Sequence, residues 1–141
     1  MIIFSEKIAK KLKEHARREA PREACGVLAG ERKSRGQLVR KIYECKNASR
    51  YPEAMYEISP RELLRVITEI EESSLEVLGF YHSHPMTLEQ PSYIDAGRAT
   101  WAGHSYVIVS LAPKSASISS WVWNEEKEHF IEEKVILSSE E

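Results

Sequence analysis

The most constraining feature of the sequence is an apolar run over residues 75–81, followed directly by His82-Ser83-His84-Pro85. A single acidic residue interrupts the run, and this pattern is typical of a strand buried on both faces of a sheet. Pro85 lacks a backbone N–H group and therefore predicts the end of that strand. Side chains two apart on a strand point the same way, so His82 and His84 should share a face, about 7 Å apart along the strand.

A second group of polar residues follows after a six-residue spacer. Ser92 is a favourable N-cap residue for an expected helix over residues 93–101, and Asp95 falls in the first turn of that helix. Two imidazoles and one carboxylate make three protein ligands, one fewer than a closed structural zinc site has. The pattern predicts a catalytic zinc site formed by His82, His84 and Asp95, with water as the fourth ligand. The simpler alternative is a pair of buried histidines and a helix-capping acid.

The segment from His82 to Asp95 matches H-x-H-P-x6-S-x-x-D, the signature of the JAMM or MPN-plus metalloproteases, without a gap or substitution. The chain resembles this family over roughly residues 2–125. Residues 23–30, with the sequence EACGVLAG, are similar to the family's first core strand, which carries its catalytic glutamate. Asn47 and residues 56–60 resemble the segment that leads into the family's second long helix.

A zinc-bound water must lose a proton and the leaving amine must gain one, and a nearby carboxylate can serve both steps. From the residues alone, Glu23, Glu57 and Glu76 all lie at the edge of an expected strand. The resemblance selects Glu23 as the general acid/base. It also implies that His82, His84 and Asp95 bind zinc, and that Ser92 stabilises the tetrahedral oxyanion alongside its capping role.

The family resemblance also implies an α/β fold: a mixed β-sheet with helices packed on it, the JAMM/MPN fold, which resembles that of cytidine deaminases. The expected activity is hydrolysis of the isopeptide bond between the C-terminal glycine of a ubiquitin-like modifier and a lysine amine. The chain looks like a compact prokaryotic form, and we expect an archaeal source. An extended modifier tail would add to an exposed strand beside the metal, clamped by residues 47–58 or 86–91.

Three alternatives stay open at this stage. Bacterial relatives remove cysteine or a short extension from a sulfur-carrier protein, and no sequence feature separates that activity from conjugate cleavage. An inactive MPN scaffold is disfavoured because the ligand set is complete. Nucleotide deamination is disfavoured because the H-x-E and P-C-x-x-C signatures are missing.

A homodimer is expected only by analogy, since family members often pair through helices; Val66, Trp121 and Trp123 are candidate contacts.

The 141 residues predict a single domain over residues 1–137 and an acidic tail over residues 138–141. The net charge of -2 gives no basic field that would attract nucleic acid. Neither a signal peptide nor a membrane-spanning run is recognisable, so a cytoplasmic location is expected. Cys25 and Cys45 flank an expected hairpin and are predicted to be reduced and structural, although a bridge between them is geometrically conceivable.

Periodicity predicts a strand over residues 2–4 and a helix from Ser5 to Glu19, followed by strands over 24–30 and 37–45. A short strand over 55–58 should precede a helix that begins at Pro60. The predicted core stripes are Ile8, Ala9, Leu12 and Ala16 in the first helix, and Leu63, Leu64, Ile67 and Ile70 in the second. His15 is expected to be structural or exposed. Further strands are predicted over 105–111 and 116–123, with a last strand or short helix over 130–137.

Overall fold

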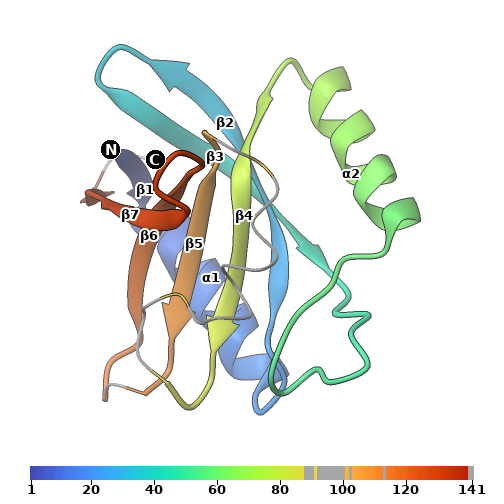
Figure 1. Ribbon diagram of the computed structural model, residues 1–141. Helices are drawn as coiled ribbons and strands as arrows, with labels where there is room; N and C mark the ends of the chain where they lie inside the picture. Colours follow the sequence, from blue (N-terminus) through green and yellow to red (C-terminus); the bar gives the residue numbers. More distant parts are fainter. Residues whose placement is uncertain (88–90, 92–100, 102, 113, 140–141) are drawn as a thin grey trace.

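The computed structural model describes residues 1–87, 91, 101, 103–112 and 114–139. The described part of the chain forms an eight-stranded mixed sheet in the order β7-β6-β5-β4-β2-β3-β1-β8, with α1 behind it and α2 at its side (Figure 1). The elements are β1 (Ile2–Ser5), α1 (Glu6–Glu19), β2 (Cys25–Lys33), β3 (Gly36–Cys45), α2 (Pro60–Glu72), β4 (Glu76–His84), β5 (Ser105–Ser110), β6 (Ser117–Asn124), β7 (His129–Glu133) and β8 (Val135–Ser138).

The two helices in the described part of the chain begin at a serine N-cap, as predicted. The Ser5 hydroxyl accepts a hydrogen bond from the Ile8 N–H group at 3.1 Å, and the Ser59 hydroxyl accepts one from the Glu62 N–H group at 3.2 Å. Pro60 occupies the first turn of α2, where its missing N–H group would have had no partner within the helix. Local sequence therefore determines where both helices start.

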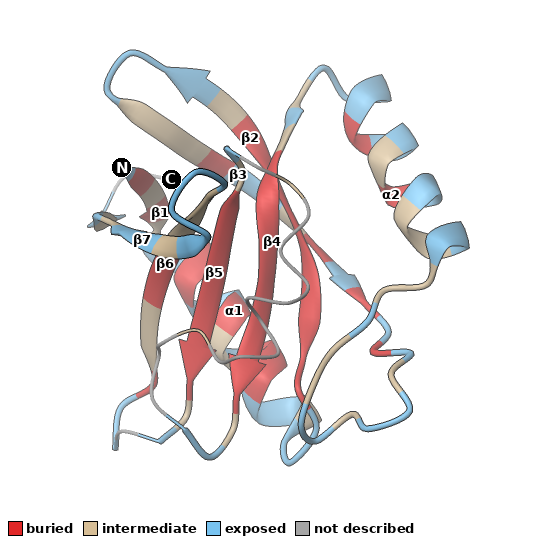
Figure 2. Ribbon diagram, viewed as in Figure 1, coloured by how far each residue is buried: buried red, intermediate tan, exposed pale blue. Residues whose placement is uncertain are grey.

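The helix α1 covers one face of the sheet. Its predicted stripe is buried and packs on residues of β2, β4 and β5, which are coloured as buried in Figure 2. The buried members of this α1-face core are Ile2, Phe4, Ile8, Ala9, Leu12, Ala16, Leu28, Val39, Leu78, Tyr81, Val107 and Val109. Because the strand residues alternate between faces, the remaining apolar side chains of the same strands form a second core on the opposite face.

The second core lies under α2, and here the predicted helix stripe needs a correction. Val66 and Ile70 are the buried residues of α2, whereas Leu64 is 67% exposed. The inward face follows the spacing Leu63, Val66, Ile70. The prediction is therefore right for Leu63 and Ile70 and wrong for Leu64, whose expected place in the core is taken by Val66. Val66 is therefore a core residue, and its surface is not free for contact with a second copy.

A bulge between β2 and β4 decides which face receives the residues at the end of β4. Leu28 pairs with Gly79 but Ala29 pairs with Val77, so Leu78 is an extra residue on β4. Strict alternation from Val77 would place residue 82 on the α1 face. The extra residue reverses which face each later side chain of β4 occupies. Phe80 therefore packs in the core under α2, the α2-face core, while Tyr81 packs in the α1-face core.

Gly79 also permits the close approach of β4 to β5. A Cβ atom at this position would lie 1.9 Å from the carbonyl oxygen of Ser105, its partner in the parallel ladder. Any side chain would therefore push the two strands apart.

Other predicted elements differ from the structure or lie outside it. Residues 55–58 do not form a strand; their main chain is bonded to a side chain, as described below. The last predicted element is two strands, β7 and β8, separated by Lys134 alone. β8 pairs in parallel with β1 and ends at Ser138. The predicted helix over 93–101 lies almost entirely outside the described residues. No helix in the described part of the chain is long and apolar enough to span a membrane.

Candidate active site

The two histidines at the end of β4 converge as the sequence predicts. The Nε2 atoms of His82 and His84 lie 3.1 Å apart, and the two rings meet edge to face with centroids separated by 4.9 Å. Both side chains are buried, with 2% and 4% of their surface exposed. At this distance one imidazole N–H group can donate a hydrogen bond to the other ring, and the same two nitrogen atoms, without a proton between them, can bind one metal ion.

The spacing of these nitrogens suits a bound zinc ion. Two zinc–nitrogen bonds of about 2.0–2.1 Å at a tetrahedral angle place two nitrogen atoms about 3.3 Å apart. Neutral imidazole is also a donor that zinc prefers. Among the residues that the structure describes, no three His, Cys, Asp or Glu side chains form a metal-binding group. The described part of the site therefore offers two ligands, and Asp95, the predicted third ligand, lies outside the described residues, as does Ser92.

Glu23 lies at the same end of the sheet as the two histidines. Cys25 is opposite His82 in the antiparallel ladder, and the next pair continues it, because the Ser83 N–H group donates to the Ala24 carbonyl at 3.0 Å. Glu23 comes directly before Ala24, just beyond the start of β2, at the end of the sheet where β4 ends at His84. Glu23 is 5% exposed, so this carboxyl group lies in a largely desolvated position.

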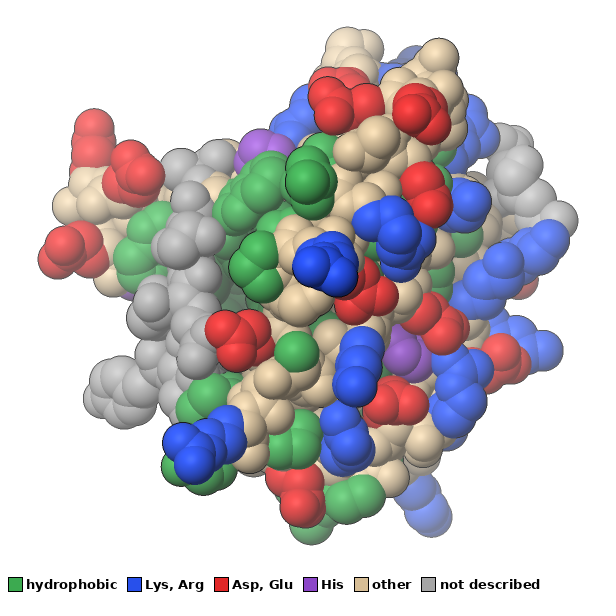
Figure 3. All heavy atoms as spheres, turned by 90° about the vertical axis from the view of Figure 1, so that its right-hand side faces the viewer, with side chains coloured by type: hydrophobic (Ala, Val, Ile, Leu, Met, Phe, Trp, Pro, Cys, Tyr) green, Lys and Arg blue, Asp and Glu red, His purple; other side chains and the backbone are tan. Residues whose placement is uncertain are grey.

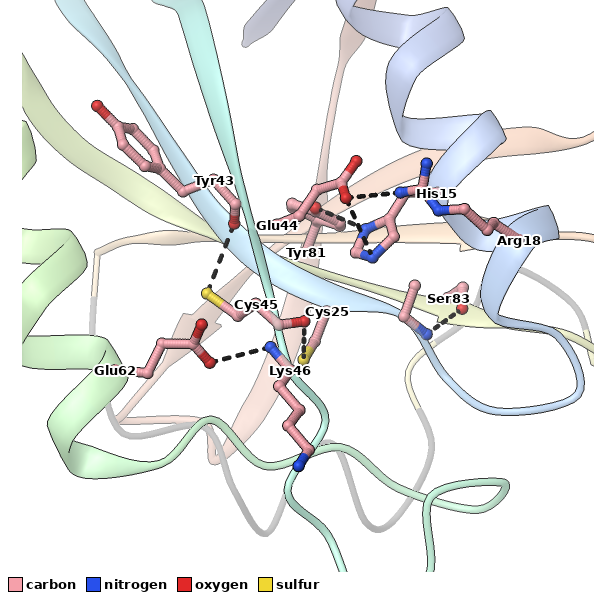
Figure 4. A network of polar contacts seen from close by, with 11 residues as sticks. His15, Arg18, Cys25, Tyr43, Glu44, Cys45, Lys46, Glu62, Tyr81 and Ser83 are labelled. Carbon is pink, nitrogen blue, oxygen red and sulfur yellow. Dashed lines mark hydrogen bonds and ion pairs between the residues drawn. The ribbon is translucent and has the colours of Figure 1, made fainter.

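The Ser83 side chain strengthens this junction from the other face. Its hydroxyl accepts a hydrogen bond of 2.7 Å from the Ala24 N–H group (Figure 4). The strand that carries the histidines is thus bonded through both main chain and side chain to the residue that follows Glu23. This arrangement fixes the main chain next to Glu23 relative to the strand that carries His84.

Tyr56 is a site residue that the sequence prediction did not single out. Its ring stacks on the His82 imidazole with centroids 4.7 Å apart and an angle of 20° between the planes. Tyr56 comes from the irregular segment between β3 and α2, and periodicity gives no signal for such a contact. A stacked aromatic ring restricts rotation of the imidazole, which helps to fix the direction of its nitrogen atoms.

A small cavity opens beside this stack, between α2, β4 and β5. It has a volume of about 160 Å3 and is lined by Tyr56, Glu57, Ile58, Leu63, Phe80, Trp101 and Tyr106. Phe80 lies two residues before His82 on the same face of β4, so the cavity and the histidines are neighbours. On this side of the molecule, Figure 3 shows hydrophobic side chains grouped among cationic and anionic ones. The cavity offers an apolar surface next to the proposed metal position.

The two cysteines are free, buried and directly opposite each other in the ladder between β2 and β3. Burial raises the pKa of the Cys45 thiol to about 12, and burial also raises the pKa of Cys25. Both groups are therefore protonated at neutral pH, whereas a nucleophile or metal ligand must be a thiolate. Cys25 and Cys45 are packing residues of the α2-face core, as the sequence predicts.

The fold resembles solved structures over nearly the whole chain. A solution structure of a protein from Desulfitobacterium hafniense is 33% identical, with a TM-score of 0.89, and the match covers 99% of this chain and 94% of that chain. A JAB1/MPN domain protein from Archaeoglobus fulgidus is 17% identical, with a TM-score of 0.62 over 97% of each chain. The predicted α/β fold of the MPN type is confirmed.

Several relatives are named for the bond or protein they act on. A desampylase from Haloferax volcanii is 38% identical over 70% of this chain and 69% of its own length. A CysO-cysteine peptidase from Mycobacterium tuberculosis is 38% identical over 68% of this chain and 64% of its own length. A probable TtuB-protein conjugate cleaving protease from Thermus thermophilus is 34% identical over 62% of this chain and 55% of its own length.

Residues 5–124 match the family described as prokaryotic homologs of the JAB domain. The matched residues contain Glu23, His82 and His84, together with Ser92 and Asp95. The predicted family and the enzyme class, a hydrolase of the peptidase type, are confirmed by this match and by the peptidase names of the relatives. The chain belongs to the family of prokaryotic homologs of the JAB domain.

Proposed function

We propose that the protein is a zinc-dependent isopeptidase, which hydrolyses the bond between the C-terminal glycine of a ubiquitin-like modifier and a lysine amine. The observation that carries the proposal is the convergence of the His82 and His84 Nε2 atoms, 3.1 Å apart at a buried strand end. The names of the desampylase and of the TtuB-conjugate protease support this class of substrate.

His82, His84 and Asp95 are the residues that would hold zinc. A zinc ion lowers the pKa of its bound water to about 7 and so supplies a nucleophile at neutral pH. Glu23 accepts the proton that the attacking water loses and delivers it to the leaving lysine amine. Ser92 donates a hydrogen bond to the oxyanion that develops on the scissile carbonyl. His82 is oriented by the stacked ring of Tyr56.

A second candidate keeps this chemistry and changes the substrate. The 38% identity to a CysO-cysteine peptidase supports removal of cysteine from the C-terminus of a carrier protein. Both substrates end in an extended tail, and both reactions cleave an acyl–nitrogen bond at its last residue. The two candidates differ in the leaving group, a lysine side chain in one and a single amino acid in the other.

The experiment that tests the proposal combines metal content with cleavage. Purified protein is assayed for bound zinc and incubated with a lysine-linked ubiquitin-like conjugate, with and without a chelator. The same assays are run on Glu23→Gln and on Glu76→Gln, a matched control at the opposite end of β4, where Glu76 forms an exposed ion pair with Arg32 at 3.8 Å.

We expect Glu23→Gln to retain zinc and to lose a factor of about 10²–10⁴ in turnover, the usual contribution of general acid–base catalysis. Glu76→Gln should retain both zinc and turnover. Near-normal activity of Glu23→Gln would remove Glu23 from the mechanism. If wild-type protein binds zinc and releases cysteine from a carrier protein but cuts no conjugate, the second candidate is correct.

A further inference from the structure

The segment between β3 and α2 has no strand or helix, yet it lies against the proposed active site. One side chain organises it. Asn47 is only 4% exposed, and its amide group makes hydrogen bonds to five main-chain groups. An asparagine amide has two N–H donors and an oxygen with two lone pairs, so this side chain is used to its full capacity.

The amide nitrogen of Asn47 faces three carbonyl oxygens. It donates to the Glu23 carbonyl at 2.9 Å, to the Met55 carbonyl at 3.0 Å and, at a longer distance of 3.3 Å, to the Pro52 carbonyl. The amide oxygen accepts from the N–H groups of Ser49 at 3.0 Å and Glu57 at 3.2 Å. Hydrogen bonds to buried main chain replace the ladder that a strand over 55–58 would have made.

The same bonds connect both parts of the proposed catalytic machinery. The Glu23 main chain is bound on both sides, because its carbonyl accepts from Asn47 and its N–H group donates to the Pro52 carbonyl at 2.7 Å. Tyr56 lies between the two residues, Met55 and Glu57, whose main chains bond to the Asn47 amide. Tyr56 in turn stacks on His82.

We propose that Asn47 is a positioning residue for the hydrolysis, which holds Glu23 and the ring of Tyr56 in register with His82. This inference rests on the proposed function. The Asn47 amide bonds to main-chain groups and would act through Glu23 and Tyr56. A shift of about 1 Å in a catalytic group can lower a rate by about 10²-fold, so loss of this connection should appear mainly in turnover.

The rival explanation is that Asn47 only stabilises a loop, and the chain offers a matched control for it. Asn124 also orders a turn, because its side-chain oxygen accepts a hydrogen bond of 2.9 Å from the Lys127 N–H group between β6 and β7. Asn124→Ala removes one exposed side-chain bond to the main chain, in a turn that contains none of the proposed catalytic residues. It should lower stability without changing the active site.

The test compares Asn47→Ala with Asn124→Ala. Zinc content, thermal stability, kcat and KM for the lysine-linked conjugate are measured for both. We expect Asn47→Ala to keep its zinc, to lose about 10–100-fold in kcat and to change KM little. Asn124→Ala should keep the wild-type kcat at temperatures where it is folded. Equal kcat values for the two variants would overturn the inference.

A second measurement does not depend on cleavage. The stacked ring of Tyr56 shifts the NMR signals of the His82 ring, so Tyr56→Leu identifies the change expected when the stack is lost. Asn47→Ala should move the His82 signals in the same direction, and Asn124→Ala should leave them in place. Unchanged His82 signals in Asn47→Ala would overturn the inference.

The two proposals can fail separately. Wild-type protein that binds zinc but cuts no conjugate contradicts the proposed function, whereas unmoved His82 signals contradict the role of Asn47. If Asn47→Ala does not fold, Tyr56→Leu tests whether the connection to His82 matters for turnover, because this variant loses the stacked ring and leaves every Asn47 bond intact. Its kcat must then fall at constant zinc content, and an unchanged kcat would refute the connection.

Discussion

A buried histidine lies on each face of the sheet, and the two differ in their partners. On the α1 face, His15 lies 2.9 Å through Nδ1 from the Tyr81 hydroxyl, and its Nε2 atom is 3.9 Å from the Glu44 carboxylate (Figure 4). On the opposite face, the Nε2 atom of His82 lies 3.1 Å from the Nε2 atom of a second imidazole, that of His84. Both His15 and His82 are less than 5% exposed.

Burial alone does not separate the structural histidine from the proposed zinc ligand, whereas a second imidazole at hydrogen-bond distance does. Tyr81 and His82 are consecutive on β4 and therefore point to opposite faces. The phenol hydroxyl can donate to or accept from an imidazole, so the His15 contact is complete within the protein. Two imidazoles can also share a hydrogen bond, but their two nitrogen atoms together make a pair of ligands that a transition-metal ion can bind, which a phenol and an imidazole do not.

The largest expected effect comes from replacing the histidine on each face with alanine, one at a time. His82→Ala should lose bound zinc and fall to the turnover of chelator-treated protein, because a two-ligand site holds zinc weakly. His15→Ala should keep zinc and turnover but unfold at a lower denaturant concentration. Metal analysis and denaturation of both variants check the pair. Stoichiometric zinc in His82→Ala would place the metal elsewhere.

The next effect concerns Ser92, which we propose as the oxyanion donor. Ser92→Ala should lower kcat by about 10²–10³-fold, the usual loss on removing one oxyanion-hole donor, while zinc content stays unchanged. Steady-state kinetics and metal analysis measure both quantities. A variant with wild-type kcat and lower helix stability would show that Ser92 is only an N-cap residue.

A smaller effect is expected on the α1 face. Tyr81→Phe removes the hydroxyl that faces His15 and leaves a buried nitrogen without that partner, which costs about 1–3 kcal/mol of unfolding free energy. Urea denaturation measures this loss. Zinc content should be unaffected, although Tyr81 is adjacent to His82, because the two side chains occupy opposite faces. Loss of zinc in Tyr81→Phe would show that the faces are coupled.

The smallest effect is a pH dependence of stability. Burial lowers the pKa of His15 below its ordinary value of 6.5, while the charge of Glu44 opposes this and that of Arg18 adds to it. The unfolded chain therefore binds a proton more readily, so the contribution of neutral His15 is fully present above about pH 6.5. It is lost as the pH falls towards the folded-state pKa, by at most about 1.4 kcal/mol per pH unit.

Unfolding free energies of wild type and His15→Gln between about pH 5 and 8 measure this dependence. The difference between the unfolding free energies of the two proteins should become smaller as the pH falls. Glu44, Arg18 and Glu19 are the charged groups that contribute to the field at His15, and they are the same in both proteins. A constant difference across this range would mean that His15 has the same pKa in the folded and unfolded chain.

The sequence predicted those parts of the fold that depend on local signals. Ser5 and Ser59 begin their helices where expected, and the run before His82 is a buried strand. The failures arise where tertiary contacts decide. Leu64 and Val66 both fit an apolar helix pattern, and only packing on the sheet determines that Val66 is the buried one. Residues 55–58 alternate like a strand but bond to Asn47 instead.

The candidate site was predictable to a similar degree. The signature identifies His82 and His84, and the structure brings them together as expected. Glu23 required the family resemblance, because a buried acid beside a distant strand has no sequence spacing to reveal it. The contribution of Tyr56 depends on a stack formed across the sheet surface, which no periodicity encodes. The roles of Ser92 and Asp95, which lie outside the described residues, stay predictions.

The pairing of the first strand with the last has a consequence for how the protein is made. β1 lies between β3 and β8, with Ile2 opposite both Gln37 and Val135. During synthesis, β1 can pair with β3 early but keeps one open edge until β8 has left the ribosome. The pairing of β1 with β8 joins residues far apart in the sequence and should therefore form late in folding. Until then the nascent chain exposes an unpaired strand edge, the kind of surface on which chaperones and aggregation compete.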